Sequence, residues 1–146
     1  MESRSVAAIR YLDAQELYKW LKAGHSASNE PFQVVDVRGS DYIGGHIAKG
    51  WNYPYRQLRD DLDKCNELRG RLDEERGSFG VINCVFHCAL SQQRGPSAAM
   101  KFLRTLSDDD LSRFRIYVLR GGFSHWQSLY GENQDVTESY KKDLWM

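Results

Sequence analysis

Apolar residues follow two different spacings along this 146-residue chain, and the two spacings alternate. In PFQVVDVR, residues 31–38, they leave no continuous polar face, which is typical of a strand covered on both sides. Between Arg56 and Arg76 they recur every three or four positions among charges, which predicts one amphipathic helix. Similar patterns predict strands at 51–53, 80–87 and 115–119, and helices at 14–24, at 97–106 and between the glycines at 121–122 and about 131.

Turn and capping residues fit this alternation. Asp13 and Glu16 have the spacing of a capping box, and Gly95 with Pro96 opens the helix predicted at 97–106. Strands that alternate with helices form a parallel sheet with helices on both faces, an α/β fold. In such sheets ligands bind beyond the carboxyl ends of the strands, and the strand at 80–87 delivers Cys88 to that end.

Composition narrows the function classes. A chain of 146 residues with 41% hydrophobic content is large enough to bury one core, so residues 1–146 are expected to form a single domain. Lysine plus arginine equal aspartate plus glutamate at 20 each, which gives no basic surface for nucleic acid. No apolar run of membrane-spanning length and no signal-type leader is recognisable, so neither nucleic acid nor membrane is an expected partner, and the cytoplasm or nucleus is the expected location. Nothing in the sequence indicates which oligomeric state the chain adopts.

The three cysteines occupy different contexts. They form no CxxC pair, so neither a disulfide framework nor a metal site is expected. Cys65 lies inside the leucine-spaced helix and Cys84 inside a strand, where a free cysteine packs as a small hydrophobe. Cys88 ends an apolar strand and begins a loop, so its thiol is the candidate for chemistry.

The loop HCALSQQRGP, residues 87–96, has the features of an anion site. Its backbone N–H groups from Ala89 to Arg94 can turn inward, and the following helix adds the partial positive charge of its N-terminus. Such a field favours the thiolate of Cys88, which is the nucleophilic form. The Arg94 guanidinium can bind two oxygens of one anion, which the point charge of a lysine does not reproduce.

This loop resembles the active-site loop of the M-phase inducer phosphatases. Two further stretches, VVDVRGSDYIGGHI and LRGGFSHW, match the flanking signatures of their rhodanese-like fold. The resemblance covers about 12–130, the expected core, and leaves 131–146 as a C-terminal tail. It is strongest for the small stand-alone fungal members and extends to rhodanese-fold arsenate reductases. It implies a central five-stranded, mostly parallel sheet with helices on both faces.

The resemblance also implies a chemistry. Cys88 becomes the nucleophile that forms a phosphocysteine and Arg94 the clamp for the phosphoryl oxygens, while the substrate-binding loop comprises Ala89, Leu90, Ser91, Gln92, Gln93 and Arg94. The expected activity is hydrolysis of phosphotyrosine or small aryl phosphates, with no metal and no organic cofactor. Arsenate reduction on the same loop is the first alternative. Sulfur transfer is disfavoured because rhodaneses typically have a loop one residue shorter, and a non-catalytic module that binds an acidic partner would not need the nucleophile.

One departure from the inducer-phosphatase pattern concerns the general acid. Gln93 replaces a loop glutamate, so residues 89–93 contain no group that can protonate a leaving oxygen. A general acid usually contributes about 10²- to 10⁴-fold, so slow hydrolysis of alkyl phosphates is expected unless another group serves. Asp36 and Asp41 are the candidates, although Asp36 fits better a structural role, bonded to backbone or to an arginine.

A second departure concerns oxidation. Val37 replaces a resolving cysteine, and Cys84 lies about 13 Å along the strand from Cys88, beyond disulfide reach. Cys88 is therefore expected to be exposed and readily oxidised. His87 is expected to be buried and to hold the loop by a hydrogen bond, and structural or surface positions are expected for the other histidines, His25, His46 and His125.

Overall fold

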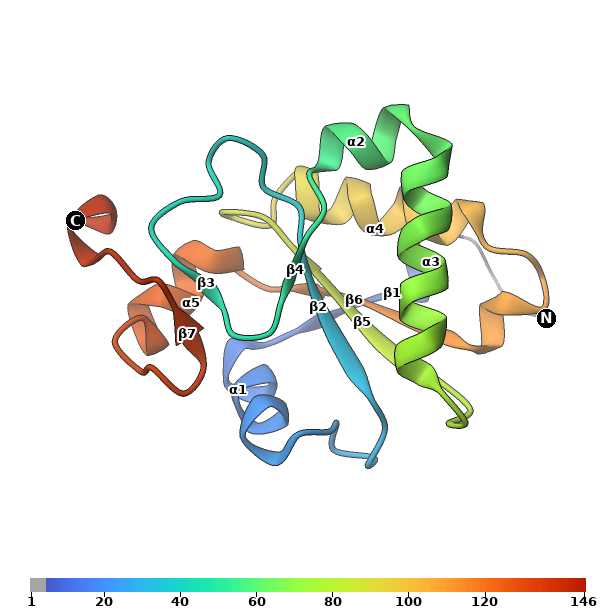
Figure 1. The fold of residues 1–146 in the computed structure, drawn as a ribbon, viewed down its shortest axis with the longest axis horizontal. Coiled ribbons are helices and arrows are strands. Elements are labelled where there is room, and N and C mark those ends of the chain that lie inside the picture. The colour runs from blue at the N-terminus through green and yellow to red at the C-terminus, as the bar shows by residue number, and fades with distance from the viewer. Residues whose placement is uncertain (1–4) are drawn as a thin grey trace.

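A parallel β-sheet forms the centre of the computed structural model, which describes residues 5–146 (Figure 1). Within these residues the sheet has five strands: β1 (Ile9–Leu12), β2 (Phe32–Asp36), β4 (Trp51–Asn52), β5 (Ile82–His87) and β6 (Phe114–Leu119). Their order is β1-β6-β5-β2-β4, and all neighbouring pairs are parallel. The predicted five-stranded parallel sheet is confirmed.

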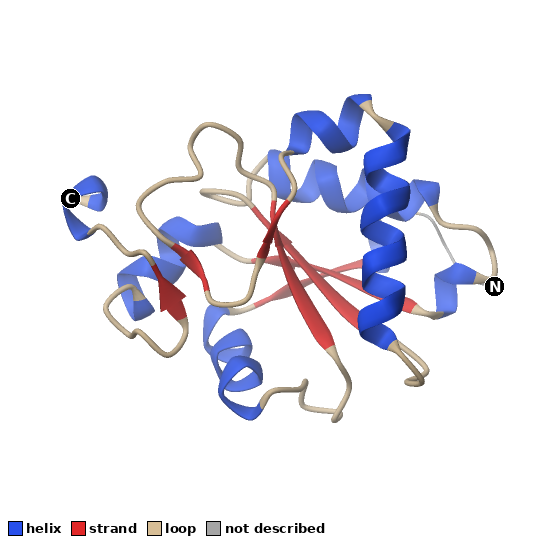
Figure 2. Cartoon of the chain, viewed as in Figure 1, coloured by secondary structure: helices blue, strands red, loops and turns tan. Residues whose placement is uncertain are grey.

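Helices cover both faces of this sheet (Figure 2). One face packs against α1 (Ala14–Ala23) and α5 (Gly122–Tyr130), and the other packs against α2 (Tyr55–Asp60), α3 (Leu62–Arg76) and α4 (Arg94–Thr105). Short 3-10 helices occur at η1 (Val6–Ala8), η2 (Asp110–Ser112) and η3 (Lys142–Trp145). A separate antiparallel pair joins β3 (His46–Ile47) to β7 (Thr137–Glu138).

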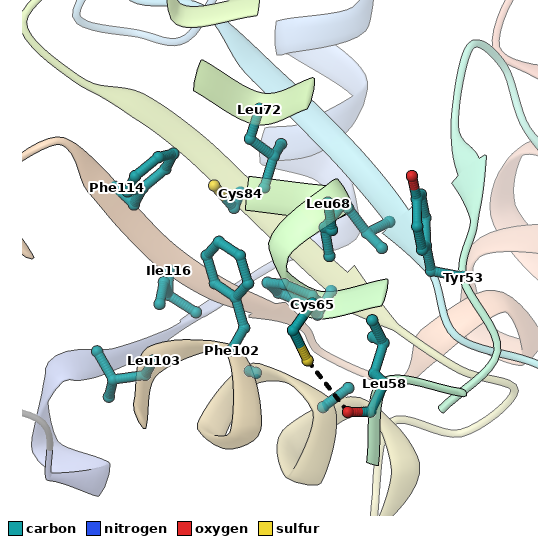
Figure 3. Packing of buried hydrophobic residues seen from close by; sticks show 14 of the residues in the cluster. Tyr53, Leu58, Cys65, Leu68, Leu72, Cys84, Phe102, Leu103, Phe114 and Ile116 are labelled. Carbon is teal, nitrogen blue, oxygen red and sulfur yellow. Dashed lines mark hydrogen bonds between the residues drawn. The ribbon is translucent and has the colours of Figure 1, made fainter. Parts of the chain in front are cut away.

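The central strand β5 is buried along its whole length because both of its faces are covered. Ile82, Cys84 and Phe86 point into the core beneath α2, α3 and α4, whereas Val85 points into the core beneath α1 and α5. Figure 3 shows Cys84 in the first of these cores, together with Cys65, whose thiol donates a hydrogen bond of 3.1 Å to the Leu58 carbonyl. Both cysteines are core residues, as predicted.

The single helix predicted between Arg56 and Arg76 is wrong, because the chain breaks at Asp61. That residue is extended, with φ −129° and ψ 102°, and its side chain accepts from the N–H of Asp63 to begin α3. The leucine spacing runs across this break, yet Leu62 is 59% exposed. The spacing of the leucines therefore did not reveal that the backbone changes direction at this position.

The capping box predicted from Asp13 and Glu16 is also wrong, although the helix itself is confirmed. Asp13 occupies the N-cap position without a side-chain capping bond and instead accepts from Arg120. Glu16 accepts from the Trp20 indole N–H at 3.1 Å. The helix ends at Gly24, which adopts the left-handed conformation with φ 85°.

Two other elements differ from the prediction. Strand β1 was not predicted, because it is a four-residue edge strand in which two positions are exposed. Helix α4 begins at Arg94 rather than at 97, since Pro96 falls in the first turn, where backbone N–H groups need no partner inside the helix.

The C-terminal segment lies against the loop that follows β2. Strand β7 pairs with β3, and the Lys141 N–H and the Trp145 indole N–H donate to the Gly44 carbonyl at 3.1 and 2.9 Å. The Trp145 ring also packs on Phe123, with 5.3 Å between ring centroids. Residues 137–145 therefore hold the loop at 39–45, which lies at the carboxyl end of the sheet.

Candidate active site

Cys88 lies where β5 ends and the loop leading to α4 begins. The Ser91 backbone reverses the chain with φ 58°, and its N–H donates to the Cys88 Sγ at 3.2 Å. Cys88 is only 3% exposed, so the prediction of an exposed thiol is wrong. The loop surrounds the sulfur, and Cys88 lines a concavity in the surface.

This concavity has a volume of about 220 Å³ and is lined by residues of the loop itself: Cys88, Ala89, Leu90, Gln92, Gln93 and Arg94. The structure thus brings together all of the predicted site residues at the concavity except Ser91, which is buried and directs its N–H at the Cys88 sulfur. Within residues 5–146, the N–H groups of Ala89, Leu90, Gln92 and Gln93 donate to no protein acceptor. They remain available to an anion, as does the N-terminus of α4.

The Arg94 guanidinium forms a bidentate ion pair with Asp41. The two nitrogen–oxygen distances are 2.7 and 2.6 Å, and both side chains are between a third and a half exposed. Hydrogen bonding to Arg94 holds the pKa of the Asp41 carboxyl below its ordinary value. Hydrogen bonding to Asp41 in turn raises the pKa of Arg94, and the Cys88 sulfur adds to that rise.

Asp36 has the structural role that its sequence context favoured. Its carboxylate accepts from Arg38 Nε and Nη2, the closest contact being 2.7 Å, and both side chains are buried. Arg38 also donates to the Gly45 carbonyl at 2.8 Å, and its guanidinium lies 4.6 Å from the centre of the Phe123 ring. Sequence analysis missed this buried arginine, which shapes the loop at 39–45; the aspartate-x-arginine spacing was the available signal.

His87 is fully buried and bonds to the backbone, as predicted. Its Nδ1 lies 3.0 Å from the Cys88 carbonyl, and because a carbonyl only accepts, Nδ1 must carry the proton. The Nε2 atom is buried without a hydrogen-bond partner among residues 5–146 and lies 3.7 Å from Asp36 Oδ2. Burial lowers the pKa of His87, so the ring is a neutral support for the loop.

The remaining histidines lie outside the concavity, as expected. His46 faces Glu138 at 3.1 Å in the β3–β7 pair, whereas His25 and His125 are exposed. Among residues 5–146 no cluster of three or more potential ligand side chains could hold a metal ion. In the same residues, none of the helices combines the length and apolarity needed to cross a bilayer.

The N-terminus of α5 fixes the other side of the Cys88 loop. The N–H groups of Phe123 and Ser124 donate to the carbonyls of Cys88 and Ala89 at 3.0 and 2.8 Å. Gly122 permits this approach, since a Cβ at that position would lie 2.5 Å from the Cys88 carbonyl oxygen. Sequence analysis did not include this contact in the site, although the glycine pair after β6 signals a close backbone approach.

Comparison with known proteins places these features in a family context. A family model described as a rhodanese-like domain matches residues 13–129. The chain is 54% identical to the CDC25-like phosphatase YCH1 of Saccharomyces cerevisiae, with 99% of each chain aligned. It is 33% identical to arsenate reductase 2.2 of Oryza sativa subsp. japonica, over 82% of each chain. A solved structure of a yeast protein tyrosine phosphatase of the rhodanese family superposes with a TM-score of 0.93 at 54% identity, covering 97% of this chain and all of the other.

Proposed function

This chain belongs to the rhodanese-like domain family, and on that premise we propose that it hydrolyses aryl phosphate esters, phosphotyrosine among them, through a phosphocysteine on Cys88. The observation that carries the proposal is the loop geometry. A nearly buried thiol lies at the floor of a concavity whose walls offer free backbone N–H groups and one guanidinium. These donors match a tetrahedral oxyanion bound directly above the sulfur.

The reaction proceeds in two displacements. The Cys88 thiolate attacks phosphorus, so that an S–P bond forms while the bond to the leaving oxygen breaks. Water then attacks the phosphocysteine and releases inorganic phosphate and the thiolate. The backbone N–H groups, the α4 N-terminus and Arg94 stabilise the charge on the equatorial oxygens, which is the main requirement of phosphoryl transfer.

Aryl esters suit this site better than alkyl esters. Because Cys88 is only 3% exposed, the phosphorus must descend into the concavity, and the long, flat side chain of phosphotyrosine reaches further than that of phosphoserine. Phenols are also better leaving groups than alkyl alcohols, and residues 89–93 carry no acid.

Arsenate reduction is the second candidate, because the chain is similar to an arsenate reductase and arsenate has the same tetrahedral shape as phosphate. The other cysteines, Cys65 and Cys84, are buried within the core, so neither lies in the loop to resolve an adduct on Cys88. Reduction would therefore require an external thiol.

The deciding experiment compares two assays on the purified chain. One measures hydrolysis of p-nitrophenyl phosphate, and the other measures arsenate reduction with glutathione and glutaredoxin. We expect Cys88→Ser to abolish hydrolysis, while the matched variants Cys65→Ser and Cys84→Ser retain most of it as long as they fold. Negligible arsenate reduction would accompany this result, and the reverse ranking of the two activities would refute the proposal.

Arg94→Lys tests the oxyanion clamp separately. Loss of one preorganised donor costs about 10²- to 10³-fold in rate, and lysine replaces the two-pronged guanidinium with a single charge. We expect a fall in kcat/KM of that size with unchanged thermal stability. An unchanged kcat/KM would show that another group binds the phosphoryl oxygens.

A further inference from the structure

Asp41 is bonded to both terminal nitrogens of the Arg94 guanidinium, the group that the proposed function assigns to substrate binding. Its Oδ1 and Oδ2 accept from Arg94 Nη1 and Nη2 at 2.7 and 2.6 Å. An oxyanion that binds the same two nitrogens must take the place of the carboxylate. Asp41 and a phosphate group therefore compete for one bidentate donor.

Displacement from Arg94 leaves Asp41 beside the bound anion, because the loop that carries it is fixed independently of Arg94. The Gly39 N–H donates to Asp41 Oδ1 at 3.1 Å. Further along the loop, Gly45 is held by Arg38, and Gly44 by Trp145. After the exchange, the carboxyl group therefore stays close to Arg94, which lines the Cys88 concavity.

The exchange also changes which form of Asp41 is stable. Before substrate binds, two charge-assisted hydrogen bonds from Arg94 favour the carboxylate. A phosphate that takes these bonds removes them from Asp41 and places negative charge next to it, and both effects favour the neutral acid. Substrate binding thus favours the protonated form of Asp41 next to the bound phosphoryl group.

No acid of the Cys88 loop competes for this role, since residues 89–93 are Ala, Leu, Ser, Gln and Gln. Asp36, the other carboxylate considered from the sequence, is buried and engaged by Arg38. Gln93 lines the concavity, but its amide N–H groups are not acidic enough to protonate a leaving oxygen. Asp41 is the carboxylate that the fold brings to Arg94 from another loop.

We propose that Asp41 exchanges with the substrate phosphoryl group on Arg94 and then donates a proton to the leaving oxygen, an inference that rests on the proposed phosphatase function. On release from Arg94 the carboxylate takes a proton from water. As the S–P bond forms and the P–O bond breaks, the departing oxygen keeps the electron pair and receives the Asp41 proton. In the second displacement the Asp41 carboxylate accepts a proton from the attacking water, which restores the acid.

The experiment compares Asp41→Asn with the wild-type chain on esters that differ only in their leaving group. We expect kcat/KM for phenyl phosphate to fall by about 10²-fold, in the range of a lost general acid, because phenolate is a poor leaving group. With p-nitrophenyl phosphate the fall should be less than about threefold, because that leaving group needs little protonation. Asp41→Ser provides a second acid-free variant in case the amide disturbs folding, and Asp41→Glu should recover at least tenfold on phenyl phosphate.

A matched control removes a different carboxylate that also binds an arginine through two nitrogens. Asp73 accepts from Arg76 Nε and Nη2 near the C-terminal end of α3. The chain runs from there to the start of β5, whereas Cys88 follows the end of β5. Asp73→Asn should leave the kinetic constants for both esters unchanged. Calorimetric binding of inorganic phosphate gives a second readout, in which Asp41→Asn should bind about two- to fivefold more tightly, the competition expected from a partly exposed ion pair.

The outcomes separate the two levels of the proposal. Equal loss on both esters would mean that Asp41 only positions Arg94, and no loss on either would mean that it takes no part; each result overturns proton donation. Unchanged or weaker phosphate binding by Asp41→Asn would overturn the exchange. If the wild-type chain shows no Cys88-dependent hydrolysis, the proposed function fails and proton donation fails with it, while phosphate binding still decides the exchange.

Discussion

Replacing Gly122 with alanine should damage both the candidate active site and the stability of the fold. Gly122 has φ 58°, and a Cβ there would lie 2.5 Å from the Cys88 carbonyl oxygen and 2.6 Å from that of Ala89. Contacts of a real Cβ do not fall below 3.0 Å, so the Cys88 loop must move by at least about 0.5 Å. The loop cannot yield as a side chain would, because both contacts are with its backbone.

The expected magnitude combines two costs. An alanine in the left-handed region costs roughly 1–2 kcal/mol. Moving the loop also weakens the hydrogen bonds from Phe123 and Ser124 to the same two carbonyls, each worth about 1 kcal/mol. We therefore expect a loss of about 2–4 kcal/mol in the free energy of unfolding. A misplacement of this order at a reacting group can cost about 10²-fold, so kcat/KM for p-nitrophenyl phosphate should fall by that factor.

The control variant Gly24→Ala measures the cost of a positive φ without a steric clash. Gly24 also has a positive φ, 85°, but a Cβ there would meet nothing within 4 Å. It should lose about 1–2 kcal/mol in urea unfolding and keep the kcat/KM of the wild-type chain. If Gly122→Ala keeps wild-type kcat/KM, or loses no more stability than Gly24→Ala, then contact with α5 does not fix the position of the Cys88 loop.

Three further predictions follow from other contacts. Arg38→Met should lower the free energy of unfolding by about 3–5 kcal/mol, because it leaves Asp36 charged and buried without its partner; a loss below 1 kcal/mol in urea unfolding would contradict this. His87→Asn should reduce the pH dependence of stability: burial lowers the pKa of the folded His87, so the unfolded chain gains this proton first as pH falls below about 6.5, and the wild-type chain should lose more stability than the variant between pH 7 and pH 5, by up to about 2 kcal/mol. Gln93→Glu, added to Asp41→Asn, should restore at least tenfold on phenyl phosphate by supplying an acid from the loop, and no recovery would mean that this position cannot reach the leaving oxygen.

The strand, loop and helix around Cys88 could be predicted because each has a local signal. Four of the six residues of β5 are apolar or cysteine, three of them consecutive at 84–86, and Gly95 with Pro96 marks the start of the helix that follows. The burial of the thiol was not predictable from this pattern. It results from the reversal at Ser91 and from the approach of α5, which begins 34 residues later than Cys88.

The ion pair between Arg94 and Asp41 could not be predicted from local sequence patterns. Asp41 is 53 residues away in the chain, on a loop without a hydrophobic period. The path of that loop depends on Arg38, and the burial of an arginine is unusual and is fixed only by its tertiary partners. Sequence analysis could name Asp41 as a candidate acid but could not place it on the guanidinium.

The attachment of residues 137–145 to the loop at 39–45 has an evolutionary consequence. The matched family region ends at residue 129, so the contacts from Lys141 and Trp145 to Gly44 come from outside it. If Asp41 is the proton donor proposed above, substitutions in this segment can change its position without altering any residue of the Cys88 loop. Relatives that keep the cysteine and the arginine of this loop could then come to accept different leaving groups through substitutions in a distant segment of the chain.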